Sequence, residues 1–595
     1  MATAVNMKVY ANDDDALIIW NVPAAIPDCL GFAIERRTYD PADPAMTTIA
    51  HQDFLPNRIG FVDDPDAAPG SSASSKMWPF QRFWWTDHAA AAGDILSYRV
   101  IPMLGTVGHL TAAQNLASEW SPVRVLAAPP NSHFNPFFNR GFVISQFMAR
   151  YLAEKNLTPR QFKDSIRRND EDMIRKFLYG YLGPALFSEL RDAASSGGDI
   201  YAALYELDDD QLIELLCALG PRAHVVLSNG SIPHKTGHSM AEERKQDQNA
   251  DARAKLLAAN VDVGETDRFT SPGALAHNKF LVRTDANGQL VSCWTGSTNW
   301  TTTGLCTQLN NGLLINDSTL AQEFLDQWHL LREVKSAFPK KLVDANSEPA
   351  PFDVPAAAQG FAPLPAPPAP STGELWFTRT RGAVDLDALN EVVKAATTGI
   401  LFLMFQPGAG GVLPTVQKAA ENPTLYVRGV VSELPAAKHQ PGQPEGGQQA
   451  DITVVRDAKS QQLTLDIIEP EGNDHPLSHW AIAEMTHGLF NSQIGHAIVH
   501  SKTLVIDPFG EHPVVVTGSH NFSTNASTKN DENFLIIRDD PTLAESYAVH
   551  IMAAYDHYRF RAAQGDNKGL SRTDDWMAPK LATSLDELRV WGVRQ

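Results

Sequence analysis

The feature that most constrains this chain is a residue pattern that occurs twice. The second copy runs from His500 to Ser523 and reads as a strand, a turn and a second strand, with polar residues at its ends. The first copy begins at His277 and repeats the order of histidine, lysine, strand, turn, strand and Gly-Ser-x-Asn. A repeat of this size predicts two copies of one domain, which commonly pack about a pseudo-twofold axis with a shared site at their interface.

The spacing within each copy predicts where the side chains lie. His500 and Lys502 are two residues apart on a strand, so both side chains point to the same face. Asn521 follows the next strand, where Gly518 permits a close backbone approach. A lysine and an asparagine on this surface suit the non-bridging oxygens of a phosphate, while the histidine performs the chemistry.

The two copies differ at an aspartate. By straight count, Thr284 matches Asp507, and Asp285 lies one residue further along. A one-residue insertion or bulge between Lys279 and Asp285 would restore the match. We therefore expect Asp285 to correspond to Asp507, and both aspartates to satisfy backbone groups at a turn or a strand end.

The copies also differ at a carboxylate further along the chain. Counting from the asparagines, Glu532 corresponds to Asn310, so the first copy lacks this carboxylate. We expect Glu532 to accept a hydrogen bond from Nδ1–H of His500, which would fix the tautomer of that ring and make it more basic. Asn310 is expected to face His277 and to orient that ring with less electrostatic help.

The doubled motif resembles that of the phospholipase D superfamily, whose signature is His-x-Lys, four residues and Asp, followed by Gly-Ser-x-Asn. The resemblance covers roughly residues 130–570. It looks closest to the nuclease-like and minimal bacterial branches, which contain both lipid and nucleic-acid phosphodiesterases. It implies a two-step mechanism without metal or cofactor. One histidine attacks phosphorus to form a phosphohistidine, and the other protonates the leaving alcohol and then activates water or an acceptor alcohol.

The resemblance also implies which residues form the site. In well-studied members the first histidine is the nucleophile, so His277 is expected to have that role. Hydroxyls of the Gly-Ser-x-Asn serines would either bind phosphate or hold the strand–turn geometry. The residues expected to be catalytic are His277, His500, Lys279, Lys502, Asn299, Asn521 and Glu532. Those expected to bind substrate or support the site are Ser297, Ser519, Asn310, Asp507 and Asp285.

Around the repeat, changes in composition predict a multidomain chain. Residues 1–128 are expected to be an all-β sandwich, and 129–344 and 373–595 two phospholipase D-like α/β domains packed as a pseudo-dimer. Between them, residues 345–372 are rich in proline and alanine and are expected to form an extended connector. Because one chain holds both motifs, we expect a monomer to form one site.

The N-terminal segment resembles a fibronectin type III domain. Residues 17–23, which contain Trp20, look like the early tryptophan strand of that domain. Residues 96–103, which contain Tyr98, look like its late tyrosine strand. Such modules bind partners or space domains, and a plain packing role is an equal alternative, so the partner of this domain is left open.

Composition narrows the function classes. The chain has 595 residues and a net charge of −20, which disfavours broad, non-specific binding to nucleic acid. Its four cysteines show no ligand spacing, so we expect neither a disulfide framework nor a metal site. The start of the chain lacks a secretory signal, and no apolar run would span a bilayer. A cytoplasmic protein, or one exported without a classical signal peptide, is expected.

Charge also bears on the substrate. The absence of a basic stripe leans against long polyanions, and a zwitterionic phospholipid suits an acidic protein better than an anionic membrane. The expected activity is hydrolysis, or transfer, of a phospholipid headgroup, with peripheral membrane contact. Apolar helices expected over 142–153 and 173–192 would flank a lipid-receiving mouth, although core packing explains them equally well. Two alternatives stay open: an endonuclease of the same superfamily, and a catalytically weakened binding scaffold.

Overall fold

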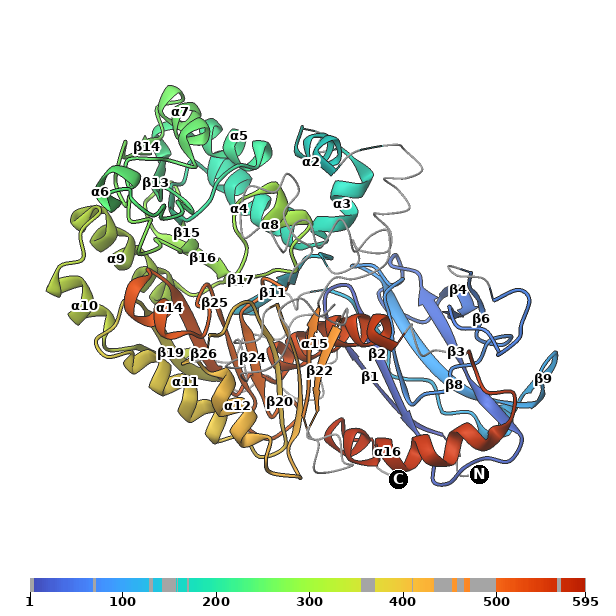
Figure 1. Ribbon diagram of the computed structural model, residues 1–595. Helices are drawn as coiled ribbons and strands as arrows, with labels where there is room; N and C mark the ends of the chain where they lie inside the picture. The colour runs from blue at the N-terminus through green and yellow to red at the C-terminus, as the bar shows by residue number, and fades with distance from the viewer. Residues whose placement is uncertain are drawn as a thin grey trace.

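The computed structural model gives the fold of most of the chain. Figure 1 shows three parts: an N-terminal β-domain in blue, a first α/β domain in green and a second α/β domain in yellow to red. Among the described residues, no helix is long and apolar enough to cross a membrane. The described residues are 5–67, 71–127, 132–141, 157, 159–168, 171–354, 370–408, 410–432, 452–456, 465–470, 499–563 and 569–593.

The N-terminal domain consists mainly of two antiparallel sheets. One has the strand order β1-β2-β7, and the other has the order β10-β8-β3-β4 with β9 paired to β8. Trp20 and Phe32 pack edge to face in the core between strands β2 and β3. The strands agree with the all-β expectation, whereas the fibronectin type III-like sandwich stays a prediction. The elements are β1 (Asn6–Ala11), β2 (Ala16–Asn21), β3 (Cys29–Tyr39), β4 (Ile49–Phe54), β5 (Pro56–Asn57), β6 (Ala73–Ser74), β7 (Trp84–Asp87), β8 (Ile95–Thr106), β9 (His109–Ala112), η1 (Gln114–Leu116) and β10 (Arg124–Val125).

The C-terminal segment returns to the N-terminal domain. It carries η3 (Asp574–Trp576) and α16 (Met577–Val590), and Figure 1 shows α16 running beneath the blue strands. The Trp576 indole N–H donates to the carbonyl of Cys29 at 3.0 Å, and the Tyr10 hydroxyl donates to the carbonyl of Trp591 at 2.5 Å. The N-terminal domain is therefore packed against the end of the chain and is not a freely tethered module.

The first α/β domain is built on a seven-stranded sheet with the order β11-β17-β16-β15-β12-β13-β14. The expected helix over 173–192 is two helices, α3 and α4, which meet at Gly180 with a φ of 53°. The expected helix over 142–153 lies outside the described residues. The elements are β11 (Phe134–Phe138), α2 (Pro159–Arg168), α3 (Met173–Tyr179), α4 (Leu182–Ser196), β12 (Ile200–Leu204), α5 (Asp210–Leu219), η2 (Gly220–Arg222), β13 (Ala223–Leu227), α6 (Met240–Glu243), α7 (Ala250–Ala258), β14 (Asp262–Val263), β15 (Lys279–Thr284), β16 (Leu290–Gly296), α8 (Thr302–Cys306), β17 (Asn311–Ile315), α9 (Ser318–Val334) and α10 (Lys340–Asn346).

The second α/β domain has a nine-stranded sheet with the order β18-β19-β26-β25-β24-β20-β21-β23-β22. Its central strand β20 is buried along its whole length, as expected for a strand covered on both faces. The elements are β18 (Ala350–Val354), β19 (Ser371–Phe377), α11 (Val384–Lys394), β20 (Gly399–Met404), α12 (Leu413–Ala419), β21 (Tyr426–Val431), β22 (Ile452–Arg456), β23 (Leu465–Pro470), β24 (Thr503–Ile506), β25 (Val514–Gly518), α14 (Thr524–Lys529), β26 (Asn533–Arg538) and α15 (Pro541–Ala563).

The expected connector over 345–372 differs from the structure at both ends. β18 and β19 pair antiparallel at the edge of the second sheet, so residues 350–354 already belong to that sheet. Hydrogen bonding of the backbone in a sheet fixes these residues more firmly than a proline-rich composition suggests. The middle of the connector, residues 355–369, lies outside the described residues.

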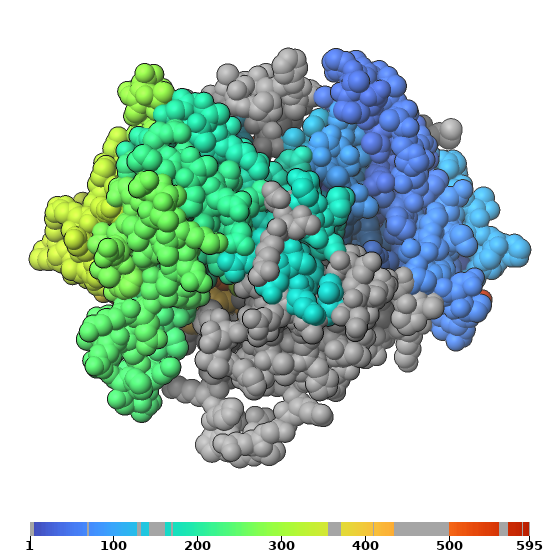
Figure 2. Space-filling view, turned by 90° about the horizontal axis from the view of Figure 1, so that it is seen from above, coloured from blue at the N-terminus to red at the C-terminus, as the bar shows by residue number. Residues whose placement is uncertain are grey.

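The two sheets share one strand order around the repeated motif. In the first domain β17, β16, β15, β12 and β13 are adjacent in this order, and in the second β26, β25, β24, β20 and β21 are. Each motif hairpin is followed by a short helix, a third strand and a long helix, α9 or α15. Figure 2, seen from above, shows the first domain in green and the N-terminal domain in blue on opposite sides, with the segment containing α3 and α4 in cyan between them.

Backbone contacts join the two motifs. The amide of His277 donates to the carbonyl of Asp531, and the amide of His500 donates to the carbonyl of Leu309, each at 2.9 Å. Both contacts are part of isolated parallel bridges, Ala276 to Asp531 and Leu309 to Val499. Each histidine is therefore held beside the segment that begins the third strand of the other half, and this crossing decides which side chains meet.

Candidate active site

Both motif histidines are buried immediately before the first strand of their hairpin. His277 is 3% exposed and His500 is 4% exposed. Lys279 begins β15 and Lys502 directly precedes β24, and each lysine lies close enough to its histidine that its charge, second to burial, lowers the pKa of that ring.

Glu532 contacts the histidine of the other half. The Glu532 Oε2 atom lies 2.7 Å from Nδ1 of His277, and the carboxylate is fully buried. The expected pairing of Glu532 with His500 is therefore wrong. The reason is the crossing of the halves: the backbone of Asp531 pairs with the backbone at His277, so the next residue, Glu532, is delivered to His277.

Asn310 makes the reciprocal contact. Its Oδ1 atom lies 2.8 Å from Nδ1 of His500, so the expectation that Asn310 faces His277 is also wrong. The carbonyl of the preceding residue, Leu309, accepts the backbone N–H of His500, which brings Asn310 to this ring. Each histidine is oriented by a residue of the opposite half.

The two serines of the Gly-Ser-x-Asn motifs support these orienting groups. The Ser519 hydroxyl donates to Oε2 of Glu532 at 2.9 Å, and the Ser297 hydroxyl donates to Oδ1 of Asn310 at 2.8 Å. Each serine oxygen also accepts a backbone N–H at 3.0 Å, from Asn533 or Asn311 in turn. Of the two roles expected for the serines, these contacts favour holding the strand–turn geometry.

The motif lysines share a second set of contacts. Nζ of Lys279 donates to the carbonyl of His277 at 2.7 Å, and Nζ of Lys502 donates to the carbonyl of His500 at 2.5 Å. Lys279 lies over the ring of Tyr205 at 5.0 Å, and Lys502 lies over the ring of Phe405 at 4.8 Å. Such contacts favour the charged form of each lysine, in opposition to the burial of the site.

Tyr205 and Phe405 are site residues that sequence reasoning missed. The ring centroid of Tyr205 is 4.6 Å from that of His277, and the ring centroid of Phe405 is 4.7 Å from that of His500. Each follows the strand next to its motif, β12 or β20, at the same end of the sheet. The signal that could have found them is an aromatic residue just past the end of an apolar strand in both halves.

The motif asparagines end each hairpin. Asn299 is 5% exposed and donates through Nδ2 to Oε2 of Glu206 at 2.9 Å; Asn521 is half-buried. Oδ1 of each asparagine is buried without a hydrogen-bond partner. Before Asn521, Gly518 has a φ of 158°, and an added Cβ would come within 2.3 Å of the carbonyl oxygen of Asn533. Glycine is therefore required where this hairpin passes the next strand.

Asp507 accepts hydrogen bonds from backbone groups at the start of strand β20. Its carboxylate accepts the N–H groups of Thr397 and Thr398, which precede strand β20, and of Gly399, which begins it. Burial raises the pKa of Asp507, but these hydrogen bonds outweigh it and leave the pKa below its usual value. The expected supporting role agrees with these contacts.

The structure corrects the expected match between Asp285 and Asp507. Thr284, not Asp285, stands in the place of Asp507: its Oγ1 accepts the backbone N–H of Asp199, at the start of the equivalent strand β12. Asp285 lies in the exposed hairpin turn and accepts the N–H groups of Asn287 and Gln289. A bulge is present, but its extra residue lies on β16 and does not shift the match.

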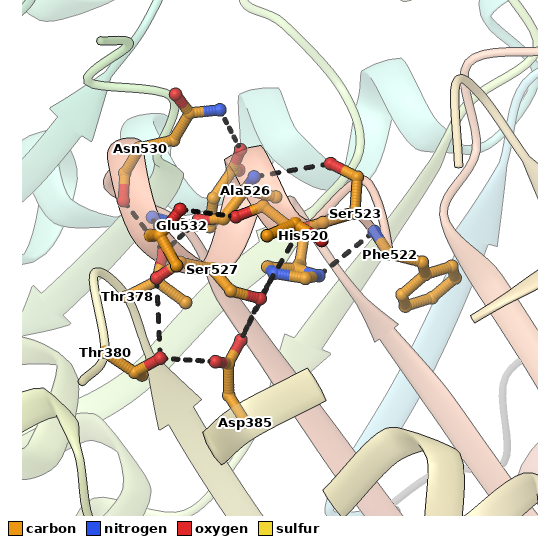
Figure 3. A network of polar contacts seen from close by, with 12 residues as sticks. Thr378, Thr380, Asp385, His520, Phe522, Ser523, Ala526, Ser527, Asn530 and Glu532 are labelled. Atoms are coloured by element: carbon orange, nitrogen blue, oxygen red, sulfur yellow. Dashed lines mark hydrogen bonds and ion pairs between the residues drawn. The ribbon is translucent and has the colours of Figure 1, made fainter. Parts of the chain in front are cut away.

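A second buried histidine supports the second half. Figure 3 shows His520, which directly precedes Asn521, with its Nε2 atom 3.3 Å from Asp385 and 3.1 Å from the Ser527 hydroxyl. The Ser527 hydroxyl in turn donates to Asp385 at 2.8 Å. Histidine and serine therefore both converge on the carboxylate, which is a structural arrangement and not that of a nucleophilic serine.

The same network reaches Glu532 through a neighbouring strand. Figure 3 shows the Thr378 hydroxyl, which accepts the backbone N–H of Glu532 at 2.9 Å and donates to the carbonyl of Asn530. The Asn530 side chain donates to Oε1 of Glu532 at 3.1 Å. Every neutral partner of the carboxylate is a donor, so the geometry favours an ionised Glu532 that accepts from His277.

A buried ion pair braces the crossing between the halves. The Arg268 guanidinium makes two hydrogen bonds of 2.7 Å to the carboxylate of Asp531, and both side chains are almost fully buried. Arg268 also donates to the carbonyl of Ala337. This pair fixes the residue that precedes Glu532, and no single-motif argument from sequence would have found it.

Burial dominates the electrostatics of the site. It lowers the pKa of Lys279 to about 7 and that of Lys502 well below its usual value. Burial and the two lysines lower the pKa values of His277 and His500 well below their usual range. Burial raises the pKa of Glu532 to about 8, but Lys279 and the hydrogen bonds from Asn530 and Ser519 act in the opposite direction and favour the ionised form that the hydrogen-bond geometry indicates. A bound anion would offset the repulsion among the positive charges of the two lysines and the two histidines.

The described residues were also compared with the needs of a metal site. Among them, no three His, Cys, Asp or Glu side chains are grouped as ligands of a metal ion would be. The expectation of a metal-free reaction is not tested by this finding and stays a prediction.

The chain is similar to proteins of one family. A family model described as cardiolipin synthase, PLD-like domain, matches residues 172–330 and 448–553. No curated protein matches the chain. Similar solved structures include the polyphosphate kinase of Porphyromonas gingivalis, with 12% identity, a TM-score of 0.38 and coverage of 68% of this chain and 53% of that chain. The chain thus spans about half the length of that kinase.

Two further solved structures are similar. The phosphatidylserine synthase of Haemophilus influenzae Rd KW20 has 10% identity and a TM-score of 0.34, with coverage of 69% of this chain and 92% of that chain. Nuc, a phospholipase D family member from Salmonella typhimurium, has 17% identity and a TM-score of 0.18, with coverage of 31% of this chain and 95% of that chain.

The family model matches each half separately, and each match contains one copy of the histidine motif together with its downstream asparagine. The resemblance first noted in the motifs is thereby confirmed. Two regions of this chain are therefore similar to the PLD-like domain family, and each carries one copy of the motif.

Proposed function

We propose that this protein hydrolyses, or transfers, the headgroup phosphodiester of a phospholipid through a phosphohistidine on His277, without metal or cofactor. The observation that carries the proposal is the crossed pair of contacts, His277 with Glu532 and His500 with Asn310. It gives one chain two oriented imidazoles with different hydrogen-bond partners, as a nucleophile and an acid require.

In the first step, Nε2 of neutral His277 attacks phosphorus. The P–N bond forms as the bond to the leaving alcohol breaks, and the leaving oxygen takes the proton from Nε2 of His500. Lys279 and Lys502 neutralise the charge on the non-bridging oxygens, and Asn299 and Asn521 supply the amides at the same place. The negative charge of the substrate raises the pKa of His500 toward the range that an acid needs, because it opposes the effect of the lysines.

In the second step, Nε2 of His500 takes a proton from water or from an acceptor alcohol. The resulting oxygen attacks phosphorus, the P–N bond breaks, and its electron pair returns to Nε2 of His277. This step restores both histidines to their starting protonation states, so the cycle needs no external acid or base.

The contacts of the rings support His277 as the nucleophile. A carboxylate that accepts from Nδ1–H keeps Nε2 of His277 free of a proton and makes it more basic, whereas the amide of Asn310 does so less for His500. The resemblance to the family also implies that His277 is the nucleophile. The first motif lacks a carboxylate of its own, but the observed pairing supplies one from the second half, Glu532.

The proposal makes the two α/β domains of a single chain a pseudo-dimer with one site, so a monomer suffices. It keeps the divisions 1–128, 129–344 and 373–595, with strand β18 (Ala350–Val354) assigned to the sheet of the last domain. Residues 569–593 belong to the last of these but pack on the first, so we expect truncation before residue 569 to expose apolar surface of the N-terminal domain.

Exposed apolar side chains support a lipid substrate with peripheral membrane contact. Met173 and Phe177 lie on α3, and Tyr181 directly precedes α4; they are 77%, 39% and 38% exposed. Exposed large apolar side chains suit the headgroup–acyl boundary of a bilayer. These three residues lie within or beside the region that the sequence predicted to flank a lipid-receiving mouth.

The test is release of choline from phosphatidylcholine vesicles, measured beside cleavage of single-stranded DNA, both in EDTA. His277→Ala and His500→Ala serve as catalytic controls, and Asp285→Ala as a matched surface control. Choline release that both histidine variants abolish supports the proposal. Cleavage of DNA with the same dependence would replace the lipid by nucleic acid, and silence on both substrates would favour the scaffold alternative.

A further inference from the structure

Asn310 occupies the place of a carboxylate but carries no charge. It is fully buried, and its Oδ1 atom lies 2.8 Å from both Nδ1 of His500 and the Ser297 hydroxyl. In the other half the same contacts belong to Glu532, with Nδ1 of His277 and the Ser519 hydroxyl. The halves thus differ in charge at otherwise matched positions.

The surrounding backbone fixes which way the Asn310 amide points. Its Nδ2 atom donates to the carbonyls of Gly304 at 2.9 Å and Gln308 at 3.4 Å. Since carbonyl oxygens only accept, Oδ1 must face His500, whose Nδ1 therefore carries the proton. An ionised carboxylate at this place would face both carbonyls, so the fold selects a neutral acceptor here.

A neutral acceptor has a chemical consequence for His500. Hydrogen bonds to charged groups are about twice as strong as those between neutral groups, so an amide stabilises an imidazolium less than a carboxylate does. The difference corresponds to on the order of tenfold in basicity of the ring. His500 therefore gives up a proton readily but takes one from water poorly.

We infer that Asn310 is a positioning residue that makes the two half-reactions unequal, so that the phosphohistidine forms quickly, breaks down slowly and accumulates. This inference rests on the proposed function. Formation draws on the basic His277 and the acidic His500, which the two partners favour. Breakdown requires His500 to remove a proton from water before the new P–O bond forms and the P–N bond breaks, and this is the role that Asn310 supports least.

The burial of the site also favours a long-lived intermediate. His277 and His500 are only 3% and 4% exposed, so few water molecules reach the phosphorus from bulk solvent. Restricted access of water lowers the tendency of the intermediate to hydrolyse.

The test is a rapid-quench experiment on the full chain with bis(p-nitrophenyl) phosphate in EDTA. p-Nitrophenolate leaves as a stable anion, so formation of the intermediate does not require the proton of His500, whereas breakdown still requires His500 as a base. We expect a burst of about one p-nitrophenolate per active site, followed by slower steady release.

Three variants separate the two phases. Asn310→Leu, of similar size, is expected to leave the burst unchanged and to lower the steady-state rate about tenfold. Asn310→Asp, whose protonated carboxyl can donate to Gly304 and still accept from His500, is expected to recover most of that loss. Glu532→Gln is expected to slow the burst instead, because it weakens His277.

The outcomes distinguish the inference from the function beneath it. Turnover without a burst in the wild type would overturn the inference and leave the proposed function standing, as would equal slowing of both phases by Asn310→Leu. Absence of p-nitrophenolate, of choline release and of any phosphohistidine in the wild type would overturn both. A burst with the expected separation of phases supports both.

Discussion

The two halves of this protein build one surface from unequal parts. Both supply a histidine, a lysine, an asparagine and a serine at matched positions at the ends of matched strands. They differ where each half reaches into the other, with Glu532 on one side and Asn310 on the other. The difference shows that a repeated domain can keep the same reacting side chains in both copies while the residues that orient the two histidines differ in charge.

The histidines should give the largest effect and the sharpest test of this comparison. Substituting either one by alanine is expected to lower steady-state turnover by about 10³-fold or more, because each group both gives and takes protons or attacks phosphorus. With bis(p-nitrophenyl) phosphate, however, His500→Ala should retain a burst and His277→Ala should show none. Rapid-quench release of p-nitrophenolate measures both. A burst in His277→Ala alone would reverse the roles of the halves.

The lysines should behave alike, because their environments match. Lys279→Met and Lys502→Met are each expected to lower kcat/KM by about 10²–10³-fold through loss of charge stabilisation. Both should also raise Tm, since burial lowers the pKa of each lysine and so works against its charged form. Steady-state kinetics and thermal melting provide the two readouts. A lower Tm in both variants would contradict the electrostatic account.

Substitutions at Asp507 and Thr284 compare how much each half loses in free energy of unfolding. Asp507→Ala is expected to lower the free energy of unfolding by about 1–3 kcal/mol, because it leaves the N–H groups of Thr397, Thr398 and Gly399 without a partner. Thr284→Val removes one acceptor and is expected to cost about 0.5–1.5 kcal/mol. Denaturant unfolding measures both, and equal losses would contradict the comparison.

The contribution of Asp507 should depend on pH in a definite direction. Its pKa is lowered in the folded state, so its stabilising effect is present above the usual aspartate value of 3.8 and is lost as the pH falls through the folded-state value. The difference in unfolding free energy between wild type and Asp507→Asn should therefore shrink in acid below about pH 4. A difference that grows on acidification would exclude this role.

Asp285 should give the smallest effect. It lies in an exposed turn and accepts two backbone N–H groups there, so Asp285→Ala is expected to change the free energy of unfolding by less than about 1 kcal/mol. Turnover should stay within twofold of the wild type, which makes this variant the matched control for the others. A loss of activity as large as that of a lysine variant would contradict this correction and favour the match of Asp285 with Asp507 that the sequence suggested.

Much of the site could be predicted without coordinates because its information is local. The two-residue spacing of His500 and Lys502 fixes a shared face on any strand, and the same holds for His277 and Lys279. The supporting role of Asp507 also followed from its place at a strand end. The match of Asp285 failed for a local reason too: the bulge lies on the partner strand β16, and spacing within one strand does not reveal it.

By itself the sequence determined the resemblance to the phospholipase D motifs, the paired histidines and lysines, and the repeat of the motif, because these follow from residue order and from spacing along the chain. Only the tertiary structure decided that Glu532 serves His277, that Asn310 serves His500, that Arg268 braces Asp531, and that the end of the chain packs on its beginning. The physical reason is that a hydrogen bond across an interface depends on how distant strands cross. The order of residues along the chain is equally consistent with two pairings: Glu532 with His277 and Asn310 with His500, or Glu532 with His500 and Asn310 with His277.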